Sequence, residues 1–101
     1  MRTILDIDFP LELFNTHVRN GTIGDLLAKI MEDIQPEAVY FSEAHGKRRG
    51  VLIVNVDSPS DVPRLAEPFF LSFNAECRFR ICMLPEDLAA AGLHELAEKW
   101  G

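Results

Sequence analysis

The chain switches repeatedly between two hydrophobic periodicities, and the order of these segments limits its fold more than any other feature. Period-two alternation and β-branched or aromatic residues predict strands over 3–9, 39–41, 51–56 and 77–83. Apolar residues at helical spacing predict helices over 22–34, 62–73 and 85–100. The predicted order is therefore β-α-β-β-α-β followed by a C-terminal helix.

This order favours one topology. Crossovers between parallel strands are almost always right-handed, and the two central strands form a hairpin. The result is an α+β, ferredoxin-like sandwich, with an antiparallel sheet in the order 4-1-3-2 and two helices on one face. No repeat or linker interrupts the sequence, so we expect one domain over residues 1–101.

Local signals place the ends of the helices and the irregular segments. Residues 11–20 mix helical spacing with turn-forming residues and are expected to be an irregular connection, at most one helical turn. Thr22 is expected to cap the first helix. Pro68 has no N–H for the Arg64 carbonyl, so we expect a kink or break near Glu67, and such a kink can open a gap between helix and sheet. The last helix, which Gly92 can interrupt, is expected to pack through Leu93, Leu96, Ala97 and Trp100.

The predicted hairpin turn contains the one cationic run of the chain, Lys47-Arg48-Arg49. On a hairpin tip, such a run can bind an anionic ligand or an acidic partner. More often it is a solvated turn that keeps strand edges from pairing wrongly, and we expect it to be dispensable for folding.

Strand parity divides the side chains of the sheet into two sets. One set is wholly apolar and should lie under the helices: Leu5, Ile7, Phe9, Leu52, Val54, Val56, Phe79 and Ile81. The other set is mixed: Ile4, Asp6, Asp8, Val51, Ile53, Asn55, Arg78, Arg80 and Cys82. A hairpin loop with an even number of residues places Tyr40 and Ser42 on the mixed face. An odd number places them on the helix side instead.

The mixed face is expected to be an interface. The first and fourth strands are neighbours in this topology, so Asp6 and Asp8 should lie across from Arg78 and Arg80. Apolar residues share the same surface, and a face with internally matched charges suits burial against a second copy of itself. We therefore expect a homodimer.

Composition limits the partners and the compartment. Ten Lys and Arg against sixteen Asp and Glu give a formal charge of −6, which disfavours nucleic acid and anionic membranes. The longest aliphatic run, residues 51–54, is too short to span a bilayer, and acids occupy the place of a signal-peptide core, so we expect a cytoplasmic protein. Cys77 and Cys82 lie about 16 Å apart on one predicted strand, beyond the disulfide limit of about 7 Å.

Several segments carry a family resemblance: Asp8-Phe9-Pro10, Phe14-Asn15-Thr16, residues 37–41, residues 66–75 and residues 83–88. Together they resemble a family of small uncharacterised bacterial proteins. The resemblance implies membership of the dimeric α+β barrel group, in which two ferredoxin-like sheets pack face to face. That group includes cofactor-free monooxygenases, muconolactone-isomerase-like enzymes, haem enzymes and stress-induced proteins. It implies no functional residues for this chain.

No catalytic motif is present, and the candidate site rests on the mixed face. His17, His45 and His94 lie in separate elements without ligand spacing, so we expect no metal and no cofactor. Asp6 or Asp8 with Tyr40 or His17 is the one acid–base combination, and a carboxylate beside an arginine is a weak general base.

Three functions are left open. The first, weakly favoured, is a non-catalytic binder of a small molecule, held within the barrel or under the helices. The second is a cofactor-free monooxygenase or isomerase acting on a small aromatic or lactone-like substrate. The third is a protein-interaction subunit using the hairpin tip or the C-terminal helix. The candidate ligand-binding residues are Asp6, Asp8, Tyr40, Asn55, Arg78 and Arg80.

Overall fold

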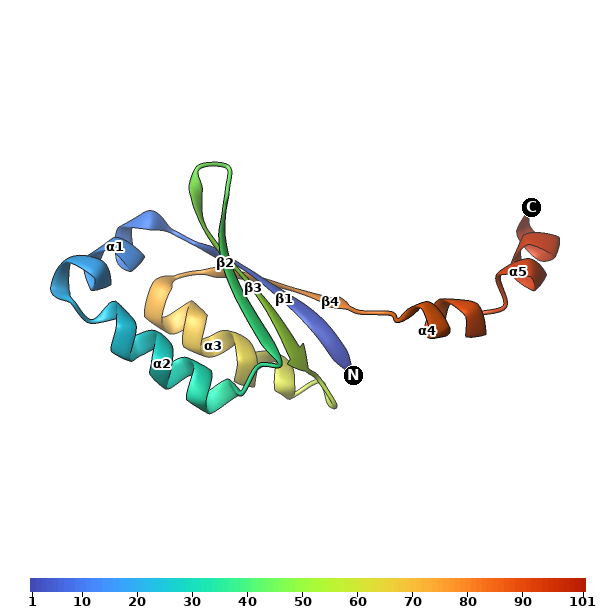
Figure 1. Ribbon diagram of the computed structural model, residues 1–101, viewed down its shortest axis with the longest axis horizontal. Helices are drawn as coiled ribbons and strands as arrows, with labels where there is room; N and C mark the ends of the chain where they lie inside the picture. Colours follow the sequence, from blue (N-terminus) through green and yellow to red (C-terminus); the bar gives the residue numbers. More distant parts are fainter.

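The computed structural model describes residues 1–101 and has α+β architecture, with helices covering one face of an antiparallel sheet (Figure 1). The strands are β1 (Arg2–Phe9), β2 (Ala38–Ala44), β3 (Lys47–Asn55) and β4 (Glu76–Ile81). The helices are α1 (Leu11–Asn20), α2 (Ile23–Ile34), α3 (Asp61–Phe73), α4 (Pro85–Ala90) and α5 (Leu93–Trp100). The strand order is β2-β3-β1-β4, which is the expected order 4-1-3-2 counted from the other edge. No helix is long and apolar enough to cross a membrane.

The core lies between the sheet and the first three helices. The central strands bury the side chains that parity assigned to the helix side, and α3 covers them with Leu65, Phe69 and Phe73. The Phe9 ring contacts Phe73 edge to face, with ring centroids 5.1 Å apart. Gly50 lies beside this ring, because a Cβ atom there would come within 3.2 Å of Phe9 Cε2. The small residue therefore makes room for the aromatic cluster.

Residues 11–20 form a complete helix, so the expectation of an irregular connection was wrong. Phe14 is buried in α1 and contacts Phe9 and Phe73, at centroid distances of 5.2 and 5.4 Å. Gly21 ends the helix in the left-handed conformation with φ of 72°. Burial of the Phe14 ring outweighs the weak helix propensity of its polar neighbours.

The hairpin turn is shorter than expected. Only His45 and Gly46 form it, both with positive φ (56° and 75°), as two-residue hairpin turns require. The run Lys47-Arg48-Arg49 therefore belongs to β3 and not to the turn. The loop is even, so Tyr40 pairs with Val51 and lies on the mixed face, as that alternative predicted.

Two local expectations for the helices are corrected. Thr22 stands at the start of α2, but its hydroxyl donates to the His17 carbonyl and caps nothing. Helix α3 runs unbroken through Pro68, and Leu65, Phe69 and Phe73 are fully buried, so no gap opens between helix and sheet. The tight packing of this apolar face holds the helix together where one backbone bond is missing.

The C-terminal segment Met83–Gly101, here called the arm, projects from the body (Figure 1). The molecule measures 59 × 28 × 19 Å, and its radius of gyration is 17.1 Å, against about 13 Å for a compact domain of this length. Gly92 interrupts the last helix, as anticipated, and separates α4 from α5. The expected packing of Leu93, Leu96 and Trp100 on their own chain was wrong, because all three are exposed. Ile81, assigned to the core, is 65% exposed where β4 leaves the body.

Candidate functional site

The uncovered face of the sheet, here called the mixed face, holds most of the predicted site residues in cross-strand rows. The register aligns Tyr40, Val51, Asp6 and Arg78 in one row. The next two rows are Ala38, Ile53, Ile4 and Arg80 on one side, and Ser42, Arg49, Asp8 and Glu76 on the other. Val51, Ile53 and Ile4 lie on the two central strands, and the charged residues extend from Arg49 on β3 through Asp6 and Asp8 on β1 to the edge strand β4.

The acids and arginines contact one another as expected, but along diagonals of the sheet. Arg80 Nη2 lies 2.6 Å from Asp6 Oδ2, and Arg78 Nη2 donates to Asp8 Oδ2 at 2.8 Å. The Asp6 side chain is only 12% exposed, whereas that of Arg80 is 62% exposed. A nearly buried carboxylate thus depends on one guanidinium that extends into solvent.

Sequence reasoning missed the third arginine of this network. Arg49 Nε donates to Asp8 Oδ1 at 2.9 Å, so Asp8 bridges two strands through Arg49 and Arg78. These hydrogen bonds hold the pKa of Asp8 below its ordinary value, and the bond from Arg49 has the larger effect. The signal was present: Arg49 has the same parity as Val51 and Ile53, and extending that alternation backward would have placed it on the mixed face.

Tyr40 and Asn55 lie apart from the charged network. Tyr40 is on the edge strand, 64% exposed, with Val51 and a whole strand between it and Asp6. Two strand spacings amount to about 10 Å, too far for direct proton transfer between the two side chains. Asn55 lies at the end of β3, where it bonds the N-terminal amine at 2.6 Å and Asp57 at 2.8 Å. Asn55 therefore fastens the N-terminus.

The histidines and cysteines do not form a reactive site. His17 bonds Thr22, His94 lies 3.1 Å from Glu98 on the same helix, and His45 occupies the hairpin turn. No group of three or more His, Cys, Asp and Glu side chains has the arrangement that a metal ion needs. Both cysteines are free, and burial raises the pKa of the Cys77 thiol to about 11, which keeps it unreactive at neutral pH.

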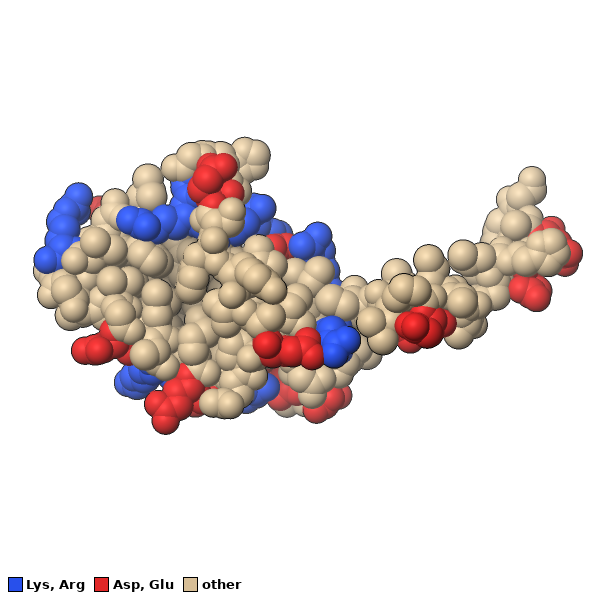
Figure 2. All heavy atoms as spheres, viewed as in Figure 1, with Lys and Arg blue, Asp and Glu red and all other residues tan.

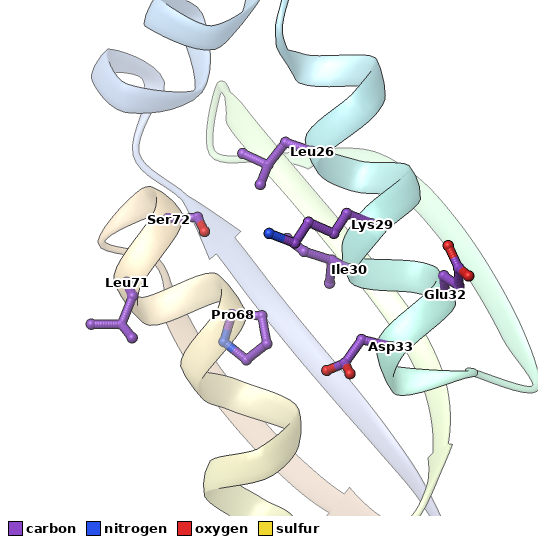
Figure 3. Close-up of a pocket in the computed structure, with 8 residues that line it drawn as sticks. All are labelled: Leu26, Lys29, Ile30, Glu32, Asp33, Pro68, Leu71 and Ser72. Atoms are coloured by element: carbon purple, nitrogen blue, oxygen red, sulfur yellow. The ribbon is translucent and has the colours of Figure 1, made fainter.

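The largest hollow of the surface is not on the mixed face. It is a groove of about 580 Å³ on the outer side of the helix layer, between α2 and α3 (Figure 3). Leu26, Ile30, Pro68 and Leu71 supply its apolar lining, and Lys29 and Asp33 lie at its rim. Pro68 thus contributes to an open groove between two helices, and not to a cavity beneath them.

Four smaller grooves are present, and one of them, of about 280 Å³, lies at the β2 edge of the body. We call it the aromatic groove; its lining is Phe9, Phe14, Ile23, Leu27, Phe41, Ser42, Arg48 and Arg49. The Arg48 guanidinium lies 4.4 Å from the centroid of the Phe14 ring and donates to Asn15 Oδ1 at 3.0 Å. Arg48 forms no ion pair, although Glu43 is its cross-strand neighbour, and this distinguishes it from Arg49 and Arg78, which both pair with Asp8.

Comparison of the sequence with protein-family models and with curated proteins finds no match. The resemblance to a family of small bacterial proteins therefore stays a prediction, and function must be argued from the faces and grooves described above.

Proposed function

We propose that the chain has the ferredoxin-like fold and pairs with a second copy through the mixed face, forming a dimeric α+β barrel that binds a small molecule between the two sheets. One observation carries the proposal: no helix covers the mixed face, although it combines the half-buried side chains of Ile4, Val51 and Ile53 and the exposed Tyr40 ring with ion pairs already matched inside the chain. Because these charges keep their partners, burying them costs less than burying unpaired charges would, and the apolar side chains beside them supply the favourable part of the association.

The residues favour binding over catalysis. A general base should titrate near neutral pH, whereas the pKa of Asp8 is lowered by Arg49 and Arg78. Tyr40 lies about two strand spacings from Asp6, so the face offers no adjacent acid–base pair. The cofactor-free enzyme is therefore the weaker alternative.

The free groups of the mixed face indicate what kind of ligand would fit. The Tyr40 hydroxyl has no partner within the chain, and the Arg80 guanidinium contacts only Asp6. Ile4, Val51 and Ile53 lie between them. A small molecule with an apolar body and a carbonyl or carboxylate oxygen matches this arrangement.

The dimer is tested by placing a charge at the centre of the mixed face. Ile53→Lys should convert a dimer into an 11.4 kDa monomer in analytical ultracentrifugation, while Leu71→Lys on the outer helix layer should not. A wild-type chain that sediments as a monomer at micromolar concentration would overturn the proposal.

The ligand is tested separately. Thermal-shift screening of a metabolite library, followed by native mass spectrometry, should find small apolar acids or carbonyl compounds that stabilise the wild-type protein but not the Ile53→Lys variant. Ligands that stabilise both variants equally would place binding outside the mixed face.

The exposed arm favours a second candidate, a protein-interaction subunit. Its large apolar side chains are exposed, and these are the surfaces that a partner protein covers.

A further inference from the structure

The arm cannot be stable as it stands in a single chain. Helices α4 and α5 contain six and eight residues, whereas isolated helices shorter than about 12–15 residues are marginal in water. Every residue from Met83 to Ala91 and from Leu93 to Gly101 is exposed, and Trp100 is 77% exposed. Packing against another surface must therefore supply the missing stability.

The charge of the arm indicates the kind of surface it needs. The arm carries four acids, Glu86, Asp87, Glu95 and Glu98, against one cation, Lys99. On its visible face the charged side chains are all acidic, while several basic side chains, with an acidic one among them, lie around α1 and the β2–β3 hairpin of the body (Figure 2). An apolar groove with a basic rim would complement it, and the aromatic groove with the unpaired Arg48 has this character.

The arm and the aromatic groove of one chain lie at opposite corners of the sheet. The arm leaves β4 after Ile81, which pairs with Thr3, whereas the groove lies at the other end of β1, beside Phe9, and on the β2 edge. The separation is about 20 Å along the strands and about 14 Å across them. To reach its own groove, the arm would have to reverse direction and cross the whole sheet.

A second copy removes this difficulty. When two sheets pack face to face with their strands crossed, a two-fold axis along the other diagonal exchanges these two corners. The root of the arm then lies at the corner of the partner that carries the aromatic groove, and because this groove opens at the β2 edge towards the helix layer, the arm would wrap around that edge to enter it. We infer that the arm of each copy packs its apolar side chains into the aromatic groove of the other copy, with its acidic side chains facing Arg48. This inference rests on the proposed dimer.

The single tryptophan provides a direct test, because Trp100 is in the arm and no other indole contributes. Its fluorescence should shift to the blue as the concentration rises through the monomer–dimer transition, which sedimentation measures independently. Arg48→Glu, and more mildly Arg48→Gln, should shift the emission of the dimer back towards the red. Lys29→Glu is the matched control, since it reverses a charge at the rim of the α2–α3 groove.

The outcomes separate this inference from the proposed function. If the chain dimerises while Trp100 keeps the emission of an exposed indole, the arm exchange is wrong and the mixed-face dimer stands. Blue emission in the monomer would show that the arm folds onto its own body, and a red shift caused by Lys29→Glu alone would show that the arm binds in the α2–α3 groove. Both overturn the inference. A chain that stays monomeric overturns the dimer and the exchange together.

Discussion

Asp6 is the most consequential charged residue of the mixed face. Its carboxylate is nearly covered, and its one cationic partner is Arg80 at 2.6 Å. Ion pairs between fully exposed groups contribute about 0–1 kcal/mol, whereas removing one partner of a buried pair costs about 3–5 kcal/mol. The Asp6–Arg80 pair lies between these limits, because one partner is buried and the other is exposed.

Arg80→Ala should therefore lower the free energy of unfolding by about 1–3 kcal/mol, because it leaves the Asp6 carboxylate without a cation. Asp6→Asn added to this variant should restore part of the loss. Urea unfolding at a low, monomeric protein concentration measures each variant of the cycle. Strict additivity of the two substitutions would show that the pair is solvated and contributes nothing.

Asp8 should make the free energy of unfolding depend on pH in the acidic range. Its folded pKa lies below the ordinary value because Arg49 and Arg78 bond the ionised form. The stabilisation is complete above the unfolded pKa of about 3.9, declines as the pH falls below it, and is lost below the folded pKa. Asp8→Asn should thus cost about 1–2 kcal/mol at pH 7, and the difference from wild type should vanish in strong acid.

Urea unfolding between about pH 2 and about pH 7 measures the difference in stability between the wild type and Asp8→Asn. Glu76→Gln is the control, because Glu76 is largely exposed and 3.9 Å from Arg78, and it should follow the wild-type profile. A cost of Asp8→Asn that is independent of pH would contradict the assignment, since it would reflect packing and not ionisation.

At the scale of elements, the sequence predicted the four strands, helices α2 and α3 and most of the side chains on each face of the sheet, but it missed helix α1 and the start of β3. Periodicity is informative where a face is buried along its whole length, as for Leu5, Ile7 and Phe9. It fails in α1, where only Phe14 reaches the core and tertiary packing overrides turn-forming neighbours. It fails again at the start of β3, because Lys47 and Arg48 resemble a solvated turn.

The candidate site was predictable in composition but not in pairing. Parity brought Asp6, Asp8, Arg78 and Arg80 to one face, yet it could not distinguish diagonal from direct pairs, which depend on side-chain length and register. Arg49 was missed because the turn was drawn too long. Nothing in local sequence could show that the arm leaves the body, since its amphipathic helices have the pattern of ordinary packed ones.

The corrected boundary of β3 changes what its cationic run should contribute. Lys47→Ser should change the free energy of unfolding by no more than about 0.5 kcal/mol, as at other exposed sites. Arg48→Ser should cost more, because it removes the contact with the Phe14 ring and the bond to Asn15. Arg49→Ser should also exceed the Lys47 variant, since it unpairs Asp8. If urea unfolding shows an equal and negligible loss of stability for all three variants, the run Lys47-Arg48-Arg49 behaves as a solvated turn and this prediction is wrong.

At the scale of the whole molecule, the body and the arm have different sources of stability. Every member of the buried hydrophobic cluster lies between Leu5 and Ala75, so the body encloses its core without the arm. The arm adds exposed apolar surface and negative charge, and neither stabilises a single chain. A segment of this kind contributes to folding only when two copies meet.

Deletion of residues 83–101 tests this division of roles. At concentrations where the chain is monomeric, the truncated protein should unfold in urea within about 0.5 kcal/mol of the full chain, because no core contact is lost. At higher concentrations the full chain should gain stability from association, and the truncated chain should gain less, because it keeps the mixed face but lacks the exchanged arm. A monomer that is strongly destabilised by the deletion would mean that the arm packs on its own body. Equal gains for the two chains would mean that the mixed face alone holds the dimer together.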